Sequence, residues 1–189
     1  ADLPALDASV TGLHFGSYSI AVAPTADAFA TLAARAKQRF ISLDPNVRPT
    51  IEPDMAVWRA RIEALLPSIT LVKASTEDIA ALYPGQNYGD VARQWLIRGP
   101  AMVVVTDGSQ GAHIWTESGA LHHAAPQVCV VDTVGAGDSF QAALLATLTE
   151  QDRMSRPALR ALTPAEAKTL PDRPRCCGAS RSPARASVT

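Results

Sequence analysis

The segment Asp132-Thr133-Val134-Gly135-Ala136-Gly137-Asp138 joins a predicted strand, Val128–Val131, to a predicted helix that carries Phe140, Leu144 and Leu148 on one face. Small residues at positions 135–137 allow the backbone to turn tightly and bring consecutive N–H groups to the start of the helix. These amides and the positive end of the helix dipole form an anion site that suits a phosphoryl group. The segment therefore predicts an α/β fold with a phosphate-binding turn.

Asp138 stands at the beginning of this predicted helix. A carboxylate beside an anion site is well placed to take a proton from a hydroxyl that attacks the bound phosphate. The alternative is that Asp138 only caps the helix and that the glycines only turn the chain. The segment taken alone leaves both interpretations open.

The rest of the chain alternates short apolar runs with helical stripes. Predicted strands are Ile41–Leu43, Ile69–Val72 and Met102–Thr106, and a helix begins at Thr25, where Thr25 is the expected N-cap. Such alternation predicts a mainly parallel, doubly wound sheet with helices on both faces, a three-layer α/β/α architecture. Ligands bind such sheets beyond the carboxyl ends of the strands.

Four polar segments each follow an apolar run directly, so we expect them at one edge of the sheet and in a single site. They are Asp44–Arg48, Lys73–Asp78, Thr106–Gly111 and Asp132–Asp138. Within the first, Asp44, Asn46 and Arg48 alternate, so all three can face the site, with the Arg48 charge available to phosphate. The alternative is a proline-bracketed turn with an exposed arginine.

Composition excludes several classes of protein. The 189 residues carry 17 Lys and Arg against 18 Asp and Glu, so there is no bulk charge for binding nucleic acid or an anionic membrane. The longest purely apolar run, Ala101–Val105, is too short to cross a bilayer. Cys129, Cys176 and Cys177 are too few for a disulfide framework, which favours a cytoplasmic protein.

Two regions differ in composition. Residues 1–170 have the pattern of an α/β domain, whereas residues 171–189 contain three Pro, four Arg and a single bulky aliphatic residue, Val188. We expect this basic tail to be disordered.

Three segments in the same order resemble the ribokinase-like (PfkB) carbohydrate kinases. Asp132–Asp138 resembles the family signature D-T-x-G-A-G-D, Asp44–Arg48 is similar to the D-P-N-x-R of fructokinases, and Thr106–Gly111 is similar to the T-x-G-x-x-G nucleotide loop. The resemblance extends from about Leu13 to about Lys168. It implies part of a ribokinase-like domain, without the family's amino-terminal lid region.

The resemblance also implies roles for individual residues. Asp138 is the implied catalytic base, and Gly135, Ala136 and Gly137 form the implied anion hole. The ATP-binding residues would be Thr106, Gly108, Ser109 and Gly111, and oxygens of Asp132 and Val134 would bind a monovalent cation such as K⁺.

Ser75 and Asp78 occupy the positions of the family's N-x-x-E motif, which is tied to Mg²⁺ and phosphate placement. Both residues depart from the motif, and Ser-x-x-acid is also a helix capping box, so the two interpretations remain open. Lys73, just before them, either reaches phosphate or lies in solvent at the end of a strand.

The implied reaction is ATP-dependent phosphorylation of a sugar, most like fructokinase, which converts fructose to fructose 6-phosphate and uses Mg²⁺. The alternatives are a 2-keto-3-deoxygluconate or other sugar kinase of the family, or a catalytically silent remnant that at most binds nucleotide. Because most sugar contacts of the family lie in the region we expect to be missing, we expect residues 1–189 alone to lack measurable turnover. The resemblance allows a homodimer for a full-length protein.

Overall fold

The computed structural model describes residues 3, 5–125, 135–167 and 170. Its centre is one six-stranded sheet in the order β1-β2-β3-β4-β5-β6, in which β1 to β4 are parallel and β5 and β6 are antiparallel to their neighbours. The strands are β1 (Gly12–Gly16), β2 (Phe40–Asp44), β3 (Leu71–Ser75), β4 (Met102–Thr106), β5 (Ala112–Thr116) and β6 (Gly119–His123). The predicted mainly parallel sheet is confirmed.

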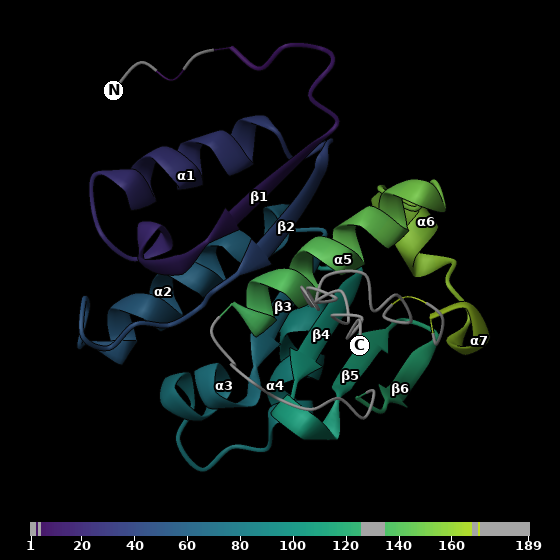
Figure 1. Ribbon diagram of the computed structural model, residues 1–189. Coiled ribbons are helices and arrows are strands. Elements are labelled where there is room, and N and C mark those ends of the chain that lie inside the picture. The colour runs from purple at the N-terminus through teal and green to yellow at the C-terminus, as the bar shows by residue number, and fades with distance from the viewer. Residues whose placement is uncertain (1–2, 4, 126–134, 168–169, 171–189) are drawn as a thin grey trace, which may run out of the picture.

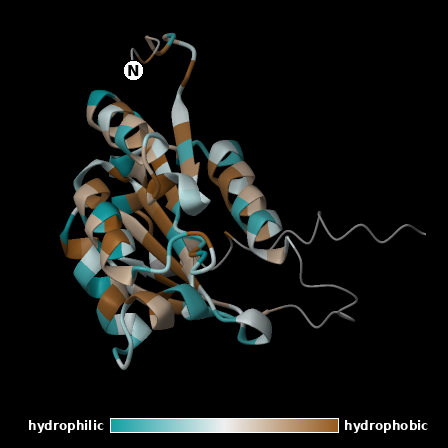
Figure 2. Cartoon of the chain, turned by 90° about the vertical axis from the view of Figure 1, so that its left-hand side faces the viewer, coloured by the Kyte–Doolittle hydropathy of each residue, from teal (hydrophilic) through white to brown (hydrophobic). Residues whose placement is uncertain are grey.

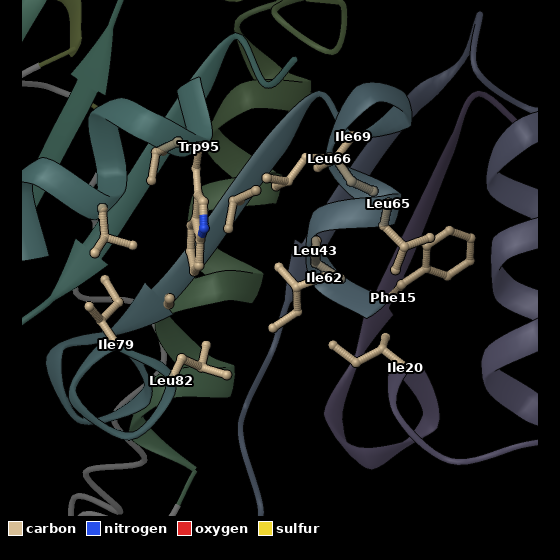
Figure 3. Close-up of a cluster of buried hydrophobic side chains, with 14 of the residues drawn as sticks. Phe15, Ile20, Leu43, Ile62, Leu65, Leu66, Ile69, Ile79, Leu82 and Trp95 are labelled. Atoms are coloured by element: carbon tan, nitrogen blue, oxygen red, sulfur yellow. The ribbon is translucent and has the colours of Figure 1, made fainter. Parts of the chain in front are cut away.

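One face of the sheet is covered by four helices, α1 (Thr25–Arg35), α2 (Met55–Leu65), α3 (Thr76–Leu82) and α4 (Tyr88–Ile97). Two short 3-10 helices, η1 (Ser17–Ile20) and η2 (Leu66–Ser68), belong to the same layer. Figure 3 shows the apolar side chains that these helices and the sheet share, with Leu43 of β2 between Phe15 of β1 and Trp95 of α4 in the chain's largest core. Alternate strand residues supply this core because successive side chains point to opposite faces.

The opposite face is covered by α5 (Ala136–Glu150), α6 (Arg156–Arg160) and α7 (Pro164–Ala167). Leu144 and Leu148 of α5 pack with Leu71 of β3 and with Met102 and Val104 of β4. Figures 1 and 2 show the two helical layers with the apolar strands between them. The described residues thus form the predicted α/β/α sandwich, and none of their helices is long and apolar enough to cross a membrane.

Local contacts define the ends of several elements. Asn87 caps α4 by accepting a hydrogen bond from the N–H of Gly89, and β5 and β6 form a hairpin around Glu117-Ser118. Thr25 was expected to be the N-cap of α1, which is wrong: it is the first helical residue, and Pro24 holds the cap position without a side-chain hydrogen bond. The predicted strand Val128–Val131 and the tail 171–189 lie outside the described residues.

One boundary differs in a way that matters for the site. Lys73 was expected to open a polar loop, but it lies inside β3, which continues to Ser75 because residues 71–75 pair in parallel with residues 102–106 of β4. The lysine is consequently buried, with 4 % of its surface exposed. The interpretation of Lys73 as a solvated residue at the end of a strand is therefore wrong.

The connection from α4 to β4 requires glycine at position 99. Gly99 has φ +152°, and a Cβ there would lie 2.5 Å from the carbonyl oxygen of Leu66 and 2.8 Å from Cα of Pro67. Both neighbours are backbone atoms of η2, so relief requires movement of a packed segment.

We predict that Gly99→Ala lowers the free energy of unfolding by about 2–4 kcal/mol, from the overlap and the unfavourable φ together. Gly85→Ala is the matched control, since Gly85 also has a positive φ (+78°) but no heavy atom within 4 Å of its built Cβ. Gly85→Ala should lower the free energy of unfolding by only about 1 kcal/mol. Urea unfolding of both variants measures the difference, and equal losses would contradict the steric explanation.

Candidate active site

A pocket of about 340 Å³ opens at the carboxyl edge of the parallel strands. Its lining comes from the end of β2 and the loop after it, from β3 and from the start of α5: Asp44, Asn46, Arg48, Lys73, Gly135, Gly137 and Asp138. Three of the four polar segments expected in one site thus meet around one cavity. Asp132 and Val134, the predicted cation ligands, lie outside the described residues.

The start of α5 has the backbone geometry expected of an anion site. Gly135 is in the left-handed conformation (φ 76°, ψ 3°) at the N-cap of a helix of 15 residues, and no side chain caps that end. The first amides of the helix therefore keep their N–H groups free of a side-chain acceptor. Such free amides and the helix dipole favour a bound anion, as a phosphoryl group would be.

Asp138 does not cap this helix, because the N-cap is Gly135 and Asp138 lies in the first turn. Its side chain is exposed and makes no hydrogen bond to another described residue. The capping interpretation of Asp138 is therefore wrong, and the carboxylate is available to the pocket that it lines.

Lys73 provides a positive charge beneath the first turn of α5. Its Nζ atom lies 3.0 Å from the point where a Cβ on Gly137 would stand, so any side chain at position 137 would press on the ammonium group. The same Nζ donates to Oδ2 of Asp44 at 2.9 Å, and the two side chains are only 5 % and 6 % exposed. The absence of a side chain at position 137 therefore lets the helix amides and a fixed cation approach the same space.

Asp44 keeps one oxygen without a partner. Among the described residues no group donates to its Oδ1, although the atom is buried. Burial raises the pKa of the Asp44 carboxyl, and the neighbouring Lys73 ammonium opposes that rise. A buried acceptor of this kind needs a donor, and a substrate hydroxyl or an ordered water in the pocket can supply one.

Asn46 and Arg48 face the same pocket as Asp44, as their alternation predicted. Asn46 has φ +42°, an uncommon value for a residue other than glycine. Between them, the N–H of Val47 donates to Oδ1 of Asp78 at 2.7 Å, and Nη1 of Arg48 donates to the Val47 carbonyl at 3.1 Å. The segment is thus a fixed turn whose polar side chains point to the cavity.

Ser75 and Asp78 form the capping box at the start of α3. The Ser75 side chain accepts from the N–H of Asp78 at 3.0 Å, while Oδ2 of Asp78 accepts from the Ser75 N–H at 2.9 Å and from its Oγ at 2.8 Å. Neither residue lines the pocket. Since Val47 takes the other oxygen, donors of the chain itself occupy both Asp78 oxygens, and the helix-capping interpretation of this pair is confirmed.

The segment Thr106–Gly111 lies at the same edge, next to the end of β3, since Thr106 pairs with Ser75. It forms a tight connection between β4 and β5 through η3 (Gly108–Gln110), closed by the N–H of Asp107 donating to the Gly111 carbonyl at 2.8 Å. Gly108 and Gly111 both have positive φ values. Thr106, Gly108, Ser109 and Gly111 lie outside the pocket lining, so their role in ATP binding stays a prediction.

Two residues of this region escaped the sequence analysis. His14 on β1 hydrogen-bonds Oγ of Ser42 through Nδ1 at 2.8 Å, and partial desolvation lowers the pKa of its imidazole, while the nearby Asp44 and Asp138 charges oppose the shift. Gln141, one turn after Asp138, is 4 % exposed and has no partner among the described residues for either amide atom. Strand alternation could have placed His14 on the face of Asp44, whereas nothing in the sequence marks Gln141.

The buried pair Lys73–Asp44 generates a stability prediction. Lys73→Met leaves the Asp44 carboxylate buried without its cation, so we expect a loss of about 3–5 kcal/mol in the free energy of unfolding. Adding Asp44→Asn removes the isolated charge and should recover about 1–3 kcal/mol of that loss.

The exposed pair Arg93–Asp90, whose side chains are 60 % and 65 % exposed, is the control. Arg93→Met should cost less than about 1 kcal/mol. Chemical unfolding of the wild type, Lys73→Met, Asp44→Asn and the double variant completes a double-mutant cycle, and additive losses at positions 44 and 73 would contradict the coupling.

Comparisons with known proteins agree with this geometry. A family model described as pfkB family carbohydrate kinase matches residues 8–168. The chain is 35 % identical over 173 residues to a fructokinase of Rhizobium leguminosarum bv. trifolii, which covers 91 % of this chain and 53 % of that protein. It is 32 % identical over 151 residues to a fructokinase of Salmonella thompson, and this match covers 78 % of this chain and 67 % of that protein.

Solved structures share the fold. A fructokinase with bound ATP from Xylella fastidiosa has a TM-score of 0.75 at 24 % identity, over 85 % of this chain and 51 % of that one. A double mutant of fructokinase from Vibrio cholerae O395, bound to fructose, ADP and potassium ion, has a TM-score of 0.68 at 26 % identity, over 79 % and 49 %. The chain thus spans about half the length of the Rhizobium relative and has the ribokinase-like fold. On the match of residues 8–168, it belongs to the pfkB family of carbohydrate kinases.

Proposed function

We propose that this chain carries the phosphoryl-transfer part of an ATP-dependent sugar kinase that converts fructose to fructose 6-phosphate. The observation that carries the proposal is the exposed Asp138 carboxylate in the first turn of α5, around the same pocket as Gly137 and the buried Lys73 ammonium. A base, an anion site and a fixed cation within one cavity are the groups that transfer of a phosphoryl group to a hydroxyl requires.

The reaction is a substitution at the γ-phosphorus of ATP. Asp138 takes the proton of the primary hydroxyl of the sugar as the hydroxyl oxygen bonds to phosphorus, and the bond to the β-phosphate oxygen breaks, so that ADP leaves with its electron pair. The amides at Gly135, Ala136 and Gly137 and the Lys73 ammonium stabilise the negative charge on the oxygens of the group in transfer. These donors are fixed before the reaction, by the helix and by the Asp44 ion pair respectively.

The loop after β2 supplies the remaining contacts in the proposal. Arg48 offers a guanidinium group to phosphate oxygens. The Asn46 amide can donate to or accept from the sugar or bound water, and the unpartnered Oδ1 of Asp44 accepts a hydrogen bond from either of them. Fixing the sugar hydroxyl in line with the phosphorus supplies a large part of the rate enhancement in reactions of this class.

Mg²⁺ fits this arrangement as a companion of the nucleotide. Among the described residues no group of three His, Cys, Asp or Glu side chains could hold a metal ion by itself. The pocket offers two carboxylates, Asp138 and Asp44. Mg²⁺ commonly binds through one or two carboxylates and substrate phosphates, and there it neutralises phosphate charge. A K⁺ site at Asp132 and Val134 remains a prediction.

Fructose is the preferred acceptor because the curated relatives at 32–35 % identity are fructokinases. Asp44-Pro45-Asn46-Val47-Arg48, the segment that resembles fructokinases, contributes three residues to the pocket. A homodimer and a cytoplasmic location stay predictions.

In a protein of the family's full length that contains this chain, Asp138→Asn should lower fructose-dependent turnover at least about 100-fold, because a positioned base is lost, and leave MgATP affinity nearly unchanged. ADP release in a coupled assay and calorimetric titration with MgATP measure the two effects. The matched control is Asp90→Asn, which alters an exposed aspartate in the first turn of another helix, α4. It should change neither the turnover nor the MgATP affinity. Normal turnover in Asp138→Asn would rule out the base assignment.

Residues 1–189 by themselves should bind MgATP but release no measurable ADP in response to fructose, since they span about half of the Rhizobium relative. In-line positioning can account for roughly 7–11 kcal/mol of such a barrier. The same coupled assay on the purified chain tests this expectation. Fructose-dependent turnover that Asp138→Asn abolishes would show that these residues suffice.

A further inference from the structure

One side chain joins the start of α3 to the loop that follows β2. Asp78 accepts three hydrogen bonds: Oδ2 receives the N–H and Oγ–H of Ser75, and Oδ1 receives the N–H of Val47 at 2.7 Å. Val47 precedes Asp78 by 31 positions, so this last bond is tertiary. Asp78 is only 8 % exposed, and groups of the chain itself donate all three of these hydrogen bonds.

The bond to Val47 is more than the capping of α3 requires. In a capping box the acidic side chain returns to the N–H of the N-cap residue, and one carboxylate oxygen is enough for that. Here Oδ2 alone makes the return bond to Ser75. The second oxygen is therefore free to bind another segment, and it binds Val47.

Val47 lies between two residues of the pocket, Asn46 and Arg48. Its side chain is buried in the core on the α1–α4 face, with 5 % exposed, and both polar groups of its backbone have partners, the N–H in Asp78 and the carbonyl in Arg48. Asn46, just before it, has the positive φ that reverses the chain. The Val47 amide is thus the point at which this turn is attached to the rest of the molecule.

We propose that Asp78 is a positioning residue for the pocket: by holding the Val47 N–H it sets the turn that presents Arg48 to the phosphoryl group in transfer and Asn46 to the sugar. The inference rests on the proposed function for the identity of these two groups. Asp78 itself does not line the pocket, and donors of the chain occupy both of its oxygens, so it acts through the turn and not through contact with a ligand.

A carboxylate suits this task better than a neutral acceptor. Hydrogen bonds to a charged acceptor are roughly twice as strong as neutral ones. A carboxylate also accepts from Val47 and Ser75 at once without presenting a donor to either N–H group. An asparagine can keep the bond to Val47 through its single oxygen but then directs its NH₂ group toward the Ser75 N–H.

The test compares Asp78→Ala with Asn87→Ala in the purified chain. Both substitutions remove a side chain that stabilises the start of a helix, α3 or α4, but only Asp78 also binds Val47. Asp78→Asn is the conservative variant, which should retain part of the wild-type behaviour even if Asp78→Ala folds poorly.

The first measurement is amide hydrogen exchange by NMR. In Asp78→Ala the Val47 amide should exchange at least about 10-fold faster, since its acceptor is gone. In Asn87→Ala the Gly89 amide, which donates to the Asn87 side chain at 2.8 Å, should exchange faster, and the Val47 amide should keep its wild-type exchange rate. Unchanged protection of Val47 in both Asp78 variants would overturn the inference.

The second measurement is the ratio of the dissociation constants for MgADP and MgATP, determined by calorimetry, which isolates the contribution of the γ-phosphate. Arg48→Met serves as the reference, because it shows how far this ratio falls when one pocket contact is removed. Asp78→Ala should lower this ratio about 10-fold, because the Arg48 contact would be misplaced. Asp78→Asn should lower the ratio less, and Asn87→Ala should leave it unchanged.

The two ideas fail differently. A wild-type chain that does not bind MgATP would contradict the proposed function, while the Val47 exchange would still decide whether Asp78 holds the turn. A wild-type preference for MgATP that Asp78→Ala leaves intact would contradict the positioning role alone.

Discussion

The buried ion pair between Lys73 and Asp44 is the interaction on which the site depends. It joins Asp44, the last residue of β2, to Lys73 in the middle of the neighbouring strand β3 at 2.9 Å, with both side chains almost fully removed from solvent. Such a pair is costly to bury, and it is retained where a charge must stand in a defined place. Here the ammonium group would lie 3.0 Å from a Cβ on Gly137, so the ion pair also leaves little room for a side chain at position 137.

The two faces of the sheet have different chemistry near the site. The face under α1–α4 is apolar in the parallel strands, with Leu43, Val72 and Val105 in its core. The face under α5 is apolar in its middle and polar at the carboxyl edge, where Ser42, Asp44, Lys73 and Gln141 are buried. Both faces therefore have an apolar core, and the pocket lies on the α5 face, at the end where α5 begins.

Helix α3 connects the candidate loops. Asp78 holds the turn at Val47, and Thr76, the first residue of α3, donates through Oγ1 to Oδ1 of Asp107 in the predicted nucleotide loop at 3.1 Å. A single short helix thus contacts the loop that lines the pocket and the loop that the family resemblance assigns to ATP. The departures from the N-x-x-E motif at Ser75 and Asp78 are compatible with this structural task, because a serine and an aspartate complete a capping box.

The sequence by itself determined the α/β class, the order of the elements and the position of the glycine turn before α5, because these follow from local periodicity and from the small residues Gly135, Ala136 and Gly137. Asp44, Asn46 and Arg48 line one cavity as expected, but the chain turns after Asp44, so the turn at Asn46 and not strand alternation brings them together. Only the tertiary structure decided that Lys73 is buried, since that depends on the pairing of β3 with β4, whose partner residues are 31 positions apart in the chain. It alone also gave Asp78 its bond to Val47 and left Gln141 unpartnered among the described residues, since burial and long-range hydrogen bonds arise when segments distant in sequence pack together.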